Sequence, residues 1–157
     1  MKKLKYSVLI WALFVCFGLT ANAQTDSRQR TVETVITDNL AQLPVSSSKE
    51  YNEVIGEMAA TGQKGMEMLA SMLKPADKAK NATFEYAINS IVNYVNVAGK
   101  ENLQDGIRKG LINGLEKCTD NANRAFLLTE LNKLATASEY SLYEKLLGDA
   151  YLQDYAI

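Results

Sequence analysis

The sequence predicts an all-α fold, a right-handed α-solenoid of about three helix pairs that follows a signal peptide. Three observations predict it: an apolar N-terminal segment, apolar residues at helical spacing through the rest of the chain, and two short phrases that recur every 30 to 40 residues or so. Strand signals are almost absent. The only prolines, Pro44 and Pro75, both stand where a predicted helix ends.

The N-terminus has the three parts of a signal peptide. Three lysines among the first five residues precede an apolar core at 7–19, and small residues at 21–23 fit a cleavage site. The apolar core is shorter than the roughly 20 residues that span a bilayer as a helix. Cleavage is therefore expected between Ala23 and Gln24, rather than a membrane anchor. Cys16 lies inside the apolar core, which disfavours a lipoprotein signal.

Cleavage of residues 1–23 would leave 134 residues, enough for one domain. Three of the 17 basic residues lie in the signal peptide, so the mature chain has 14 basic and 18 acidic residues and a net charge of −4. A nucleic-acid partner would require a basic patch and is not expected. We expect an N-terminal helix within 24–47 and a repeat domain over 48–157, whose last repeat is incomplete.

Apolar residues at helical spacing predict a first helix over 32–40 and a second over 51–59. Ser47 and Glu50 have the spacing of a capping box at the start of the second helix. Gly62 follows its end, where helices favour glycine.

The same spacing predicts a third helix over 66–73 and a fourth over 84–95. The fourth has the clearest pattern, with its apolar residues on one face and polar residues on the other. Gly99 interrupts the pattern, and a fifth helix is predicted over 103–115.

Two further helices complete the prediction. Asp120 is a candidate cap for a sixth helix over 127–134, and Ser138 is a candidate cap for a seventh over 142–147, which Gly148 ends. All connections are short, so consecutive helices are expected to be antiparallel neighbours.

Two phrases recur in register along the chain, an alanine within one set of helices and an apolar triplet within the other. The first phrase centres on Ala87, Ala125 and Ala156, and the second opens on Leu69, Leu111 and Tyr143. A two-helix unit that repeats at this interval is typical of an α-solenoid. Coincidence within an ordinary helical bundle is the alternative.

The stretches GQKGMEMLASMLKPADKAKNATFEYAINSIVNYV, at 62–95, and NRAFLLTELNKLATASEYSLYEKLLGDAYLQDYAI, at 123–157, resemble HEAT-repeat segments of secreted proteins from Gram-negative bacteria. The resemblance covers the chain from about residue 31 onward. It implies a scaffold with no catalytic motif, located in the periplasm or at the cell exterior. In longer relatives the repeats continue, and some are followed by a β-sandwich domain assigned to keto-glycoside hydrolysis or glycan binding.

The last residues, 149–157, have the pattern of the first turns of another alanine helix. Tyr151, Leu152 and Tyr155 would make a poor solvent-facing cap, because terminal repeats usually carry a polar outer face. We therefore expect the chain to be a fragment of a longer array, with a short frayed cap as the alternative. Self-association through this C-terminal end is a further way to cover it.

Three glycines are spaced by four residues in DGIRKGLINGLEKC, namely Gly106, Gly110 and Gly114, which we call the glycine strip. Each glycine costs a helix interior about 1 kcal/mol relative to alanine. Three in one helix indicate a line along which another backbone approaches closely. The first interpretation is tight packing against a neighbouring helix, and the second is a shallow groove for a partner helix or strand.

Aromatic residues supply the candidate contacts for a partner. Tyr86 and Tyr143 are expected in the core by their spacing. The only tryptophan leaves with the signal peptide, so a strong carbohydrate platform is not expected. The candidate exposed contacts are Phe126, Tyr140, Tyr151 and Tyr155.

Composition removes most catalytic and metal sites. The chain has no histidine, which removes Ser-His-Asp and Cys-His nucleophilic sites and histidine-ligated metals. Cys118 is the only cysteine after cleavage, and we expect it to be a buried apolar residue, with a reactive thiol as the alternative. Glu101 and Asp105 share a helix face, as solvated surface pairs do. No enzymatic activity, cofactor or metal is expected.

These observations favour a non-catalytic, exported protein-interaction scaffold of HEAT-like repeats, with a protein partner and no membrane span once the signal peptide is cleaved. The alternative is a repeat module attached to a glycan-active domain that this chain does not contain.

Overall fold

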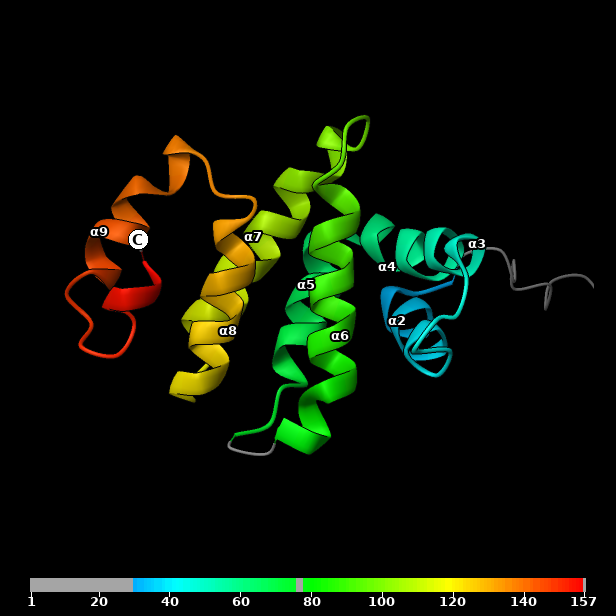
Figure 1. Ribbon diagram of the computed structural model, residues 1–157, viewed down its shortest axis with the longest axis horizontal. Coiled ribbons are helices and arrows are strands. Elements are labelled where there is room, and N and C mark those ends of the chain that lie inside the picture. Colours follow the sequence, from blue (N-terminus) through cyan, green and yellow to red (C-terminus); the bar gives the residue numbers. More distant parts are fainter. Residues whose placement is uncertain (1–29, 76–77, 157) are drawn as a thin grey trace, which may run out of the picture. The chain divides into compact units, whose positions relative to one another are not determined.

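The computed structural model describes residues 30–75 and 78–156, and the structural statements below concern these residues (Figure 1). They form helices and turns without a strand, which confirms the all-α prediction. The predicted signal peptide lies outside the described residues. The helices, in chain order, are α2 (Val32–Leu40), α3 (Ser48–Glu50), η1 (Tyr51–Ile55), α4 (Gly56–Ala60), α5 (Gly62–Ser71), α6 (Lys78–Val95), α7 (Glu101–Lys117), α8 (Asn121–Asn132), η2 (Ala137–Glu139), α9 (Tyr140–Leu146) and η3 (Gln153–Tyr155).

Side-chain caps begin the first two helical segments. The Thr31 hydroxyl accepts a hydrogen bond from the Thr34 amide at 3.1 Å and starts α2. The Ser47 hydroxyl accepts one from the Glu50 amide at 3.2 Å, as the predicted capping box requires. The second hydrogen bond of the box differs from the expected one. The Glu50 carboxylate accepts hydrogen bonds from the amide and the hydroxyl of Ser46, each at 2.9 Å, rather than from the amide of Ser47. The carboxylate therefore fixes the residue before the cap.

A π-helical turn, η1, lies between α3 and α4 within the continuous helical stretch 48–60. Such a turn holds one more residue than an α-helical turn does. At its start, the Tyr51 hydroxyl donates a hydrogen bond to the carbonyl of Ser90 in α6 at 2.8 Å, and its ring lies 6.2 Å from that of Tyr94. The turn thus faces α6, which it contacts in addition to its neighbours along the chain, α3 and α4.

Two glycines adopt positive φ between helices. Gly62, at φ +60°, separates α4 from α5, and Gly99, at φ +87°, lies in the loop between α6 and α7. Residues that carry a side chain rarely adopt a positive φ, so glycine is favoured at both positions. Both glycines stand at helix junctions where the sequence predicted an interruption, although α5 begins at Gly62 itself, four residues earlier than predicted.

The seventh predicted helix begins differently from expectation. Asp120 caps α8 as predicted, accepting a hydrogen bond from the Asn123 amide at 2.9 Å. Ser138, in contrast, is not the cap of the next helix. Thr136 caps it, and the Glu139 carboxylate accepts a hydrogen bond from the Thr136 amide at 2.7 Å, which completes a capping box.

The C-terminal residues form a compact turn rather than the opening of a further α-helix. The Asp149 carboxylate accepts hydrogen bonds from the amides of Tyr151 and Leu152, at 3.0 and 3.2 Å, and the short 3-10 helix η3 follows. Leu152 and Ala156 are buried, so this turn covers part of the core.

The helices contact one another in two series. In one, α2 contacts α5, and α5 contacts α7; in the other, α4 contacts α6, α6 contacts α8, and α8 contacts η3. Contacts between α5 and α6 and between α7 and α8 join the two series, and Figure 1 shows these four helices side by side. The recurring alanines are all buried on the second series. The recurring Leu69 and Leu111 are buried on the first, whereas Tyr143 of α9 is half-buried.

Two buried asparagines, Asn81 of α6 and Asn123 of α8, link these helices to the turn after α5, which local sequence patterns do not predict. The Asn81 amide group accepts a hydrogen bond from the Lys74 amide and donates to the Lys74 carbonyl, both at 2.8 Å. It also donates to Asn123 of α8 at 3.1 Å. These bonds pair the polar atoms of the two buried asparagines and hold the backbone of Lys74 in the turn after α5.

Candidate interaction surface

The glycine strip lies against α5. A Cβ atom added to Gly110 would stand 2.5 Å from the Met66 Cβ and 2.8 Å from the Gln63 carbonyl oxygen, and one added to Gly114 would stand 2.5 Å from the Ala70 Cβ. These distances are shorter than van der Waals contact. The strip is therefore covered by helix packing, and it offers no open groove to a partner strand.

Three of the four candidate contact residues are exposed. Tyr140 is 72% exposed, and Tyr151 and Tyr155 are also exposed, with their rings stacked at 6.4 Å between centroids. Phe126 is partly buried and packs against the core, so its assignment as an exposed contact was wrong. Leu147, which the prediction did not include, is exposed as well.

Of the two tyrosines expected in the core, one is exposed and the other is partly buried. Tyr86 is exposed, so its expected burial was wrong. Tyr143 is half-buried against the core, and its hydroxyl donates a hydrogen bond to the Asn132 side chain at 2.6 Å. Burial, together with the nearby negative charge of Glu139, raises the pKa of Tyr143 to about 12.

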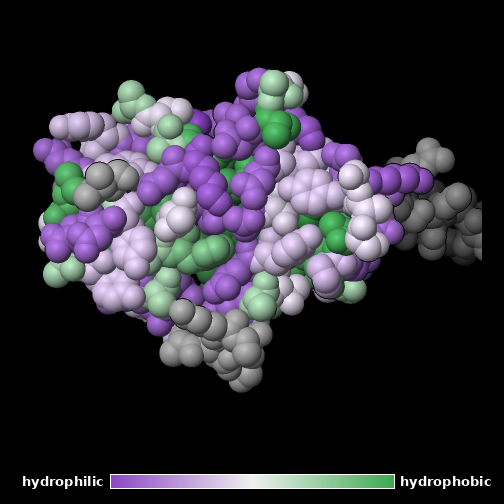
Figure 2. Space-filling view, in the orientation of Figure 1, coloured by the Kyte–Doolittle hydropathy of each residue, from purple (hydrophilic) through white to green (hydrophobic). Residues whose placement is uncertain are grey.

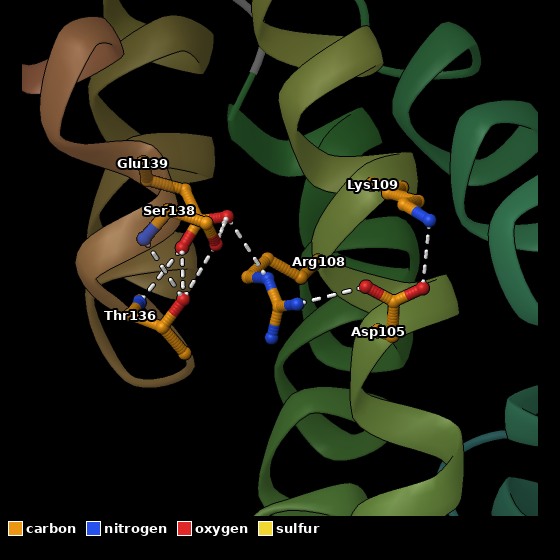
Figure 3. A network of polar contacts seen from close by, with 6 residues as sticks. All are labelled: Asp105, Arg108, Lys109, Thr136, Ser138 and Glu139. Carbon is orange, nitrogen blue, oxygen red and sulfur yellow. Dashed lines mark hydrogen bonds and ion pairs between the residues drawn. The ribbon is translucent and has the colours of Figure 1, made fainter.

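An ion-pair network joins α7 to the start of α9 (Figure 3). The Arg108 guanidinium lies 3.1 Å from the Glu139 carboxylate and 2.8 Å from that of Asp105, which also pairs with Lys109. The Arg108 and Glu139 side chains are only 14% and 7% exposed. Because Glu139 also closes the capping box at Thr136, one carboxylate both starts the helix and holds it to α7.

Burial raises the pKa of Glu139, but hydrogen bonds from Thr136 and Ser138 and the charge of Arg108 outweigh it, so the pKa lies below its ordinary value. The pKa of Asp105 is also lowered, chiefly by its hydrogen bond with Lys109. The backbone amide of Tyr151 is the main cause of the lowered pKa of Asp149. These carboxylates are ionised at neutral pH, and a general acid needs the opposite shift.

A second polar cluster joins α5 to α7 around Glu67. Its carboxylate accepts hydrogen bonds from Asn113 at 2.6 Å and from Gln63 at 2.8 Å, and pairs with Lys117 at 3.2 Å. These three interactions, in that order, lower the pKa of Glu67 to about 2. The contacts with Asn113 and Lys117 could not be predicted, because these residues follow Glu67 by 46 and 50 positions in the sequence.

Glu67→Gln is expected to reduce the sensitivity of the fold to acid. The folded-state pKa of about 2 lies below the unfolded value of 4.5, so the contribution of Glu67 is complete above about pH 4.5 and is lost as the pH falls toward 2. The difference in Tm between wild type and variant should therefore be larger at pH 7 than at pH 3. Glu53→Gln, which changes an exposed carboxylate 3.9 Å from Lys49, is the control and should show no such change. A pH-independent difference for Glu67→Gln would contradict the assignment.

Two hollows lie on the described surface. One, of about 320 Å³, is formed by α5, α7 and the loop into α8, and Cys118 lines it. The other, of about 460 Å³, is lined by neutral side chains of 45–48 together with Tyr51, Asn52 and Tyr86. Cys118 is partly buried against the core rather than buried as expected, and its thiol lies 3.6 Å from the Asp120 carbonyl oxygen.

Cys118 is expected to react with a small maleimide in the folded protein, but more slowly than in the unfolded chain. Its half-burial at the edge of a hollow gives the reagent partial access. Mass spectrometry of the mature protein at timed intervals, with and without denaturant, measures both rates. Equal rates would show that the thiol is fully exposed, and no native-state labelling would show that it is sealed.

The two carboxylates that share a face of α7, Glu101 and Asp105, are engaged in local structure. Glu101 accepts a hydrogen bond from the Gly99 amide at 3.0 Å, and Asp105 belongs to the network in Figure 3. Within 30–75 and 78–156, no group of three acidic or cysteine side chains is placed to hold a metal ion. None of the helices in this part of the chain combines the length and apolar character needed to cross a bilayer.

Comparison with known protein families, characterised proteins and solved structures finds no match for this chain. The function is therefore inferred from the residues exposed on the surface. The face drawn in Figure 2 is mainly hydrophilic, with its hydrophobic residues in small groups between hydrophilic ones. Against that background, the exposed residues of α9 and the C-terminal turn are the candidate interaction surface: Tyr140, Leu147, Tyr151 and Tyr155.

Proposed function

We propose that the chain is a non-catalytic, exported protein-interaction scaffold of HEAT-like helix pairs, arranged as a right-handed α-solenoid. The observation that carries the proposal is that both recurring phrases fall on helices in contact, α5 with α7 in one series, and α6 with α8 and α8 with the C-terminal turn in the other. One phrase recurs in α5, α7 and α9, and the other in α6, α8 and the C-terminal turn. Repeated units that stack on their neighbours extend a surface for binding proteins.

The chemistry of the surface supports binding rather than catalysis. Glu67 and Glu139, two carboxylates with a lowered pKa, are held by hydrogen bonds and ion pairs rather than poised as general acids. The exposed tyrosines combine an apolar ring with a polar hydroxyl, and tyrosine is enriched where proteins bind one another. A protein partner is the occupant that such a surface fits.

Site-specific photo-crosslinking in the native cell tests the proposal. A photoreactive phenylalanine analogue would replace Tyr140, Tyr151 or Tyr155, one at a time. Each is an exposed aromatic residue, so the replacement should leave the fold intact. We expect a discrete protein adduct at one or more of these positions. The same replacement at Tyr86, an exposed tyrosine of α6, is the matched control, and should give weaker adducts or none.

Discrete adducts at none of the four positions would contradict the scaffold function. The intact mass of the protein recovered from its native cell tests export at the same time. Loss of residues 1–23 is the expected result, since that segment has the pattern of a signal peptide. A much larger mass would favour the alternative in which the repeats are attached to a glycan-active domain.

A further inference from the structure

We propose that the hollow between the start of the helical stretch 48–60 and α6 binds an uncharged sugar, either free or as part of a glycan. The hollow measures about 460 Å³, and we call it the serine hollow after its lining: Val45, Ser46, Ser47, Ser48, Tyr51, Asn52 and Tyr86. Its volume lies within the roughly 300–1,000 Å³ of sites for small molecules. The inference does not depend on the scaffold function proposed above.

The lining of the serine hollow carries no charge at neutral pH. Its side chains are hydroxyls, one amide, two phenols and one valine, and burial raises the pKa of the Tyr51 phenol above its ordinary value. The neighbouring Glu50 carboxylate already accepts two hydrogen bonds from Ser46. An ionic ligand would lose part of its hydration here without gaining a counter-charge. The lining therefore favours an uncharged polar ligand.

Polar groups of the lining can both donate and accept further hydrogen bonds. The Ser47 hydroxyl accepts one from the Glu50 amide at 3.2 Å and keeps its own hydrogen to donate. The Asn52 side chain donates to the Ser48 carbonyl at 2.9 Å, and its own carbonyl oxygen can accept. The exposed hydroxyl of Ser48 can do both. Sugar hydroxyls also donate and accept, so these groups fit a ring that carries several of them.

Two tyrosine rings supply the apolar part of the lining. Tyr86 of α6 is 36% exposed, and Tyr51 is partly buried against the core. A sugar ring has apolar C–H faces, which can pack on an aromatic ring while the hydroxyls reach polar groups beside it. The serine hollow thus offers both kinds of contact that an uncharged sugar makes.

Hydrogen bonds fix the lining in the absence of a ligand. The Tyr51 hydroxyl donates to the Ser90 carbonyl at 2.8 Å, which holds the tyrosine to α6. The Glu50 carboxylate holds the amide and the hydroxyl of Ser46. Groups fixed in this way lose little conformational entropy on binding. The serines and Asn52 are exposed, so the contact area is small and a millimolar dissociation constant is expected.

Titration of the isotope-labelled mature full chain with sugars, followed by heteronuclear NMR, tests the inference. The probes are glucose, galactose, mannose and N-acetylglucosamine, each as the free sugar and as its trisaccharide. For at least one probe we expect saturable shifts of the amides within 45–52 and around Tyr86, with a midpoint below about 20 mM. A trisaccharide that binds about tenfold more tightly would identify a glycan as the source, and equal midpoints a single sugar residue.

Two variants of the full chain separate the two kinds of contact. Tyr86→Ala removes the exposed ring, and Ser48→Ala removes an exposed hydroxyl that does not cap the helix, since Ser47 does. Each should weaken binding about fivefold and leave the circular dichroism spectrum unchanged. Tyr140→Ala is the matched control, because it replaces an exposed tyrosine outside the serine hollow. Its midpoint should equal that of wild type.

The absence of saturable shifts at up to about 50 mM of every probe would overturn the inference. Shifts confined to residues outside the serine hollow would do so too, as would binding that Tyr86→Ala leaves unchanged. Glucuronate, which is charged at neutral pH, should bind more weakly than glucose. Tighter binding of glucuronate would show that the lining does not select an uncharged ligand, and would also overturn the inference.

Discussion

Gly110→Leu is expected to destabilise the fold by more than about 3 kcal/mol, and Gly110→Ala by about 1–2 kcal/mol, as overpacking in a well-packed core does. The added Cβ atom would stand 2.8 Å from the backbone carbonyl oxygen of Gln63, which cannot rotate away, and 2.5 Å from the Met66 Cβ. The helix propensity gained by replacing glycine, about 1 kcal/mol, offsets only part of this cost. Urea unfolding followed by circular dichroism measures the loss.

Gly106→Ala is the matched control in the same helix. The Cβ atom added there would lie 3.3 Å from the Gln63 amide nitrogen, so a small adjustment can accommodate it. Its free energy of unfolding should stay within about 1 kcal/mol of wild type, because the gain in helix propensity balances the contact. Equal effects of alanine at Gly106 and Gly110, or no effect at either, would contradict the packing of the glycine strip on α5.

Arg108→Met is expected to cost about 3 kcal/mol, the lower end of the range for removing one partner of a buried ion pair. The Glu139 carboxylate would remain 7% exposed without its main counter-charge, and the hydrogen bonds from Thr136 and Ser138 would compensate only partly. The loss of stability should be largest at the junction between α7 and α9. Hydrogen exchange of the α9 amides should therefore accelerate more than exchange in α5.

Lys109→Met is the control for this variant. Lys109 pairs with Asp105 across 2.8 Å, but both side chains are more than half exposed, so the expected loss is below about 1 kcal/mol. A double-mutant cycle of Arg108→Met with Glu139→Gln isolates the coupling between the two partners. A coupling near zero would mean that Arg108 acts through its aliphatic stem rather than its charge.

Local signals in the sequence predicted most of the helices. Asp120 and Ser47 were identified as caps because a cap depends on residues within one turn. The cap predicted at Ser138 was wrong, although the sequence also carries a local signal for the observed cap. Thr136 is followed three residues later by Glu139, which is the spacing of a capping box. Apolar residues at helical spacing resume only at Leu142, after the 3-10 turn at 137–139, and this spacing favours Ser138 over Thr136 as the cap.

The polar clusters could not be predicted in the same way. Glu67 meets Asn113, and Arg108 meets Glu139, only after α5, α7 and α9 have packed. A single sequence does not show which charged residues, distant along the chain, form a pair in the fold. Tyr86 was misassigned for a related reason: periodicity tells which side of a helix is apolar, but the exposure at the edge of that side depends on the neighbouring helices.

The π-helical turn at Tyr51–Ile55 has a consequence for the deletion of a single residue. A π turn is an α-helix with one residue inserted, so removing one residue there restores α-helical geometry and leaves both flanks in phase. Loss of the exposed Asn52 should therefore be tolerated. The same loss within α7 would turn half of that helix by about 100° relative to the other half. The turn at Tyr51–Ile55 is therefore the helical position at which this chain should best tolerate the loss of one residue.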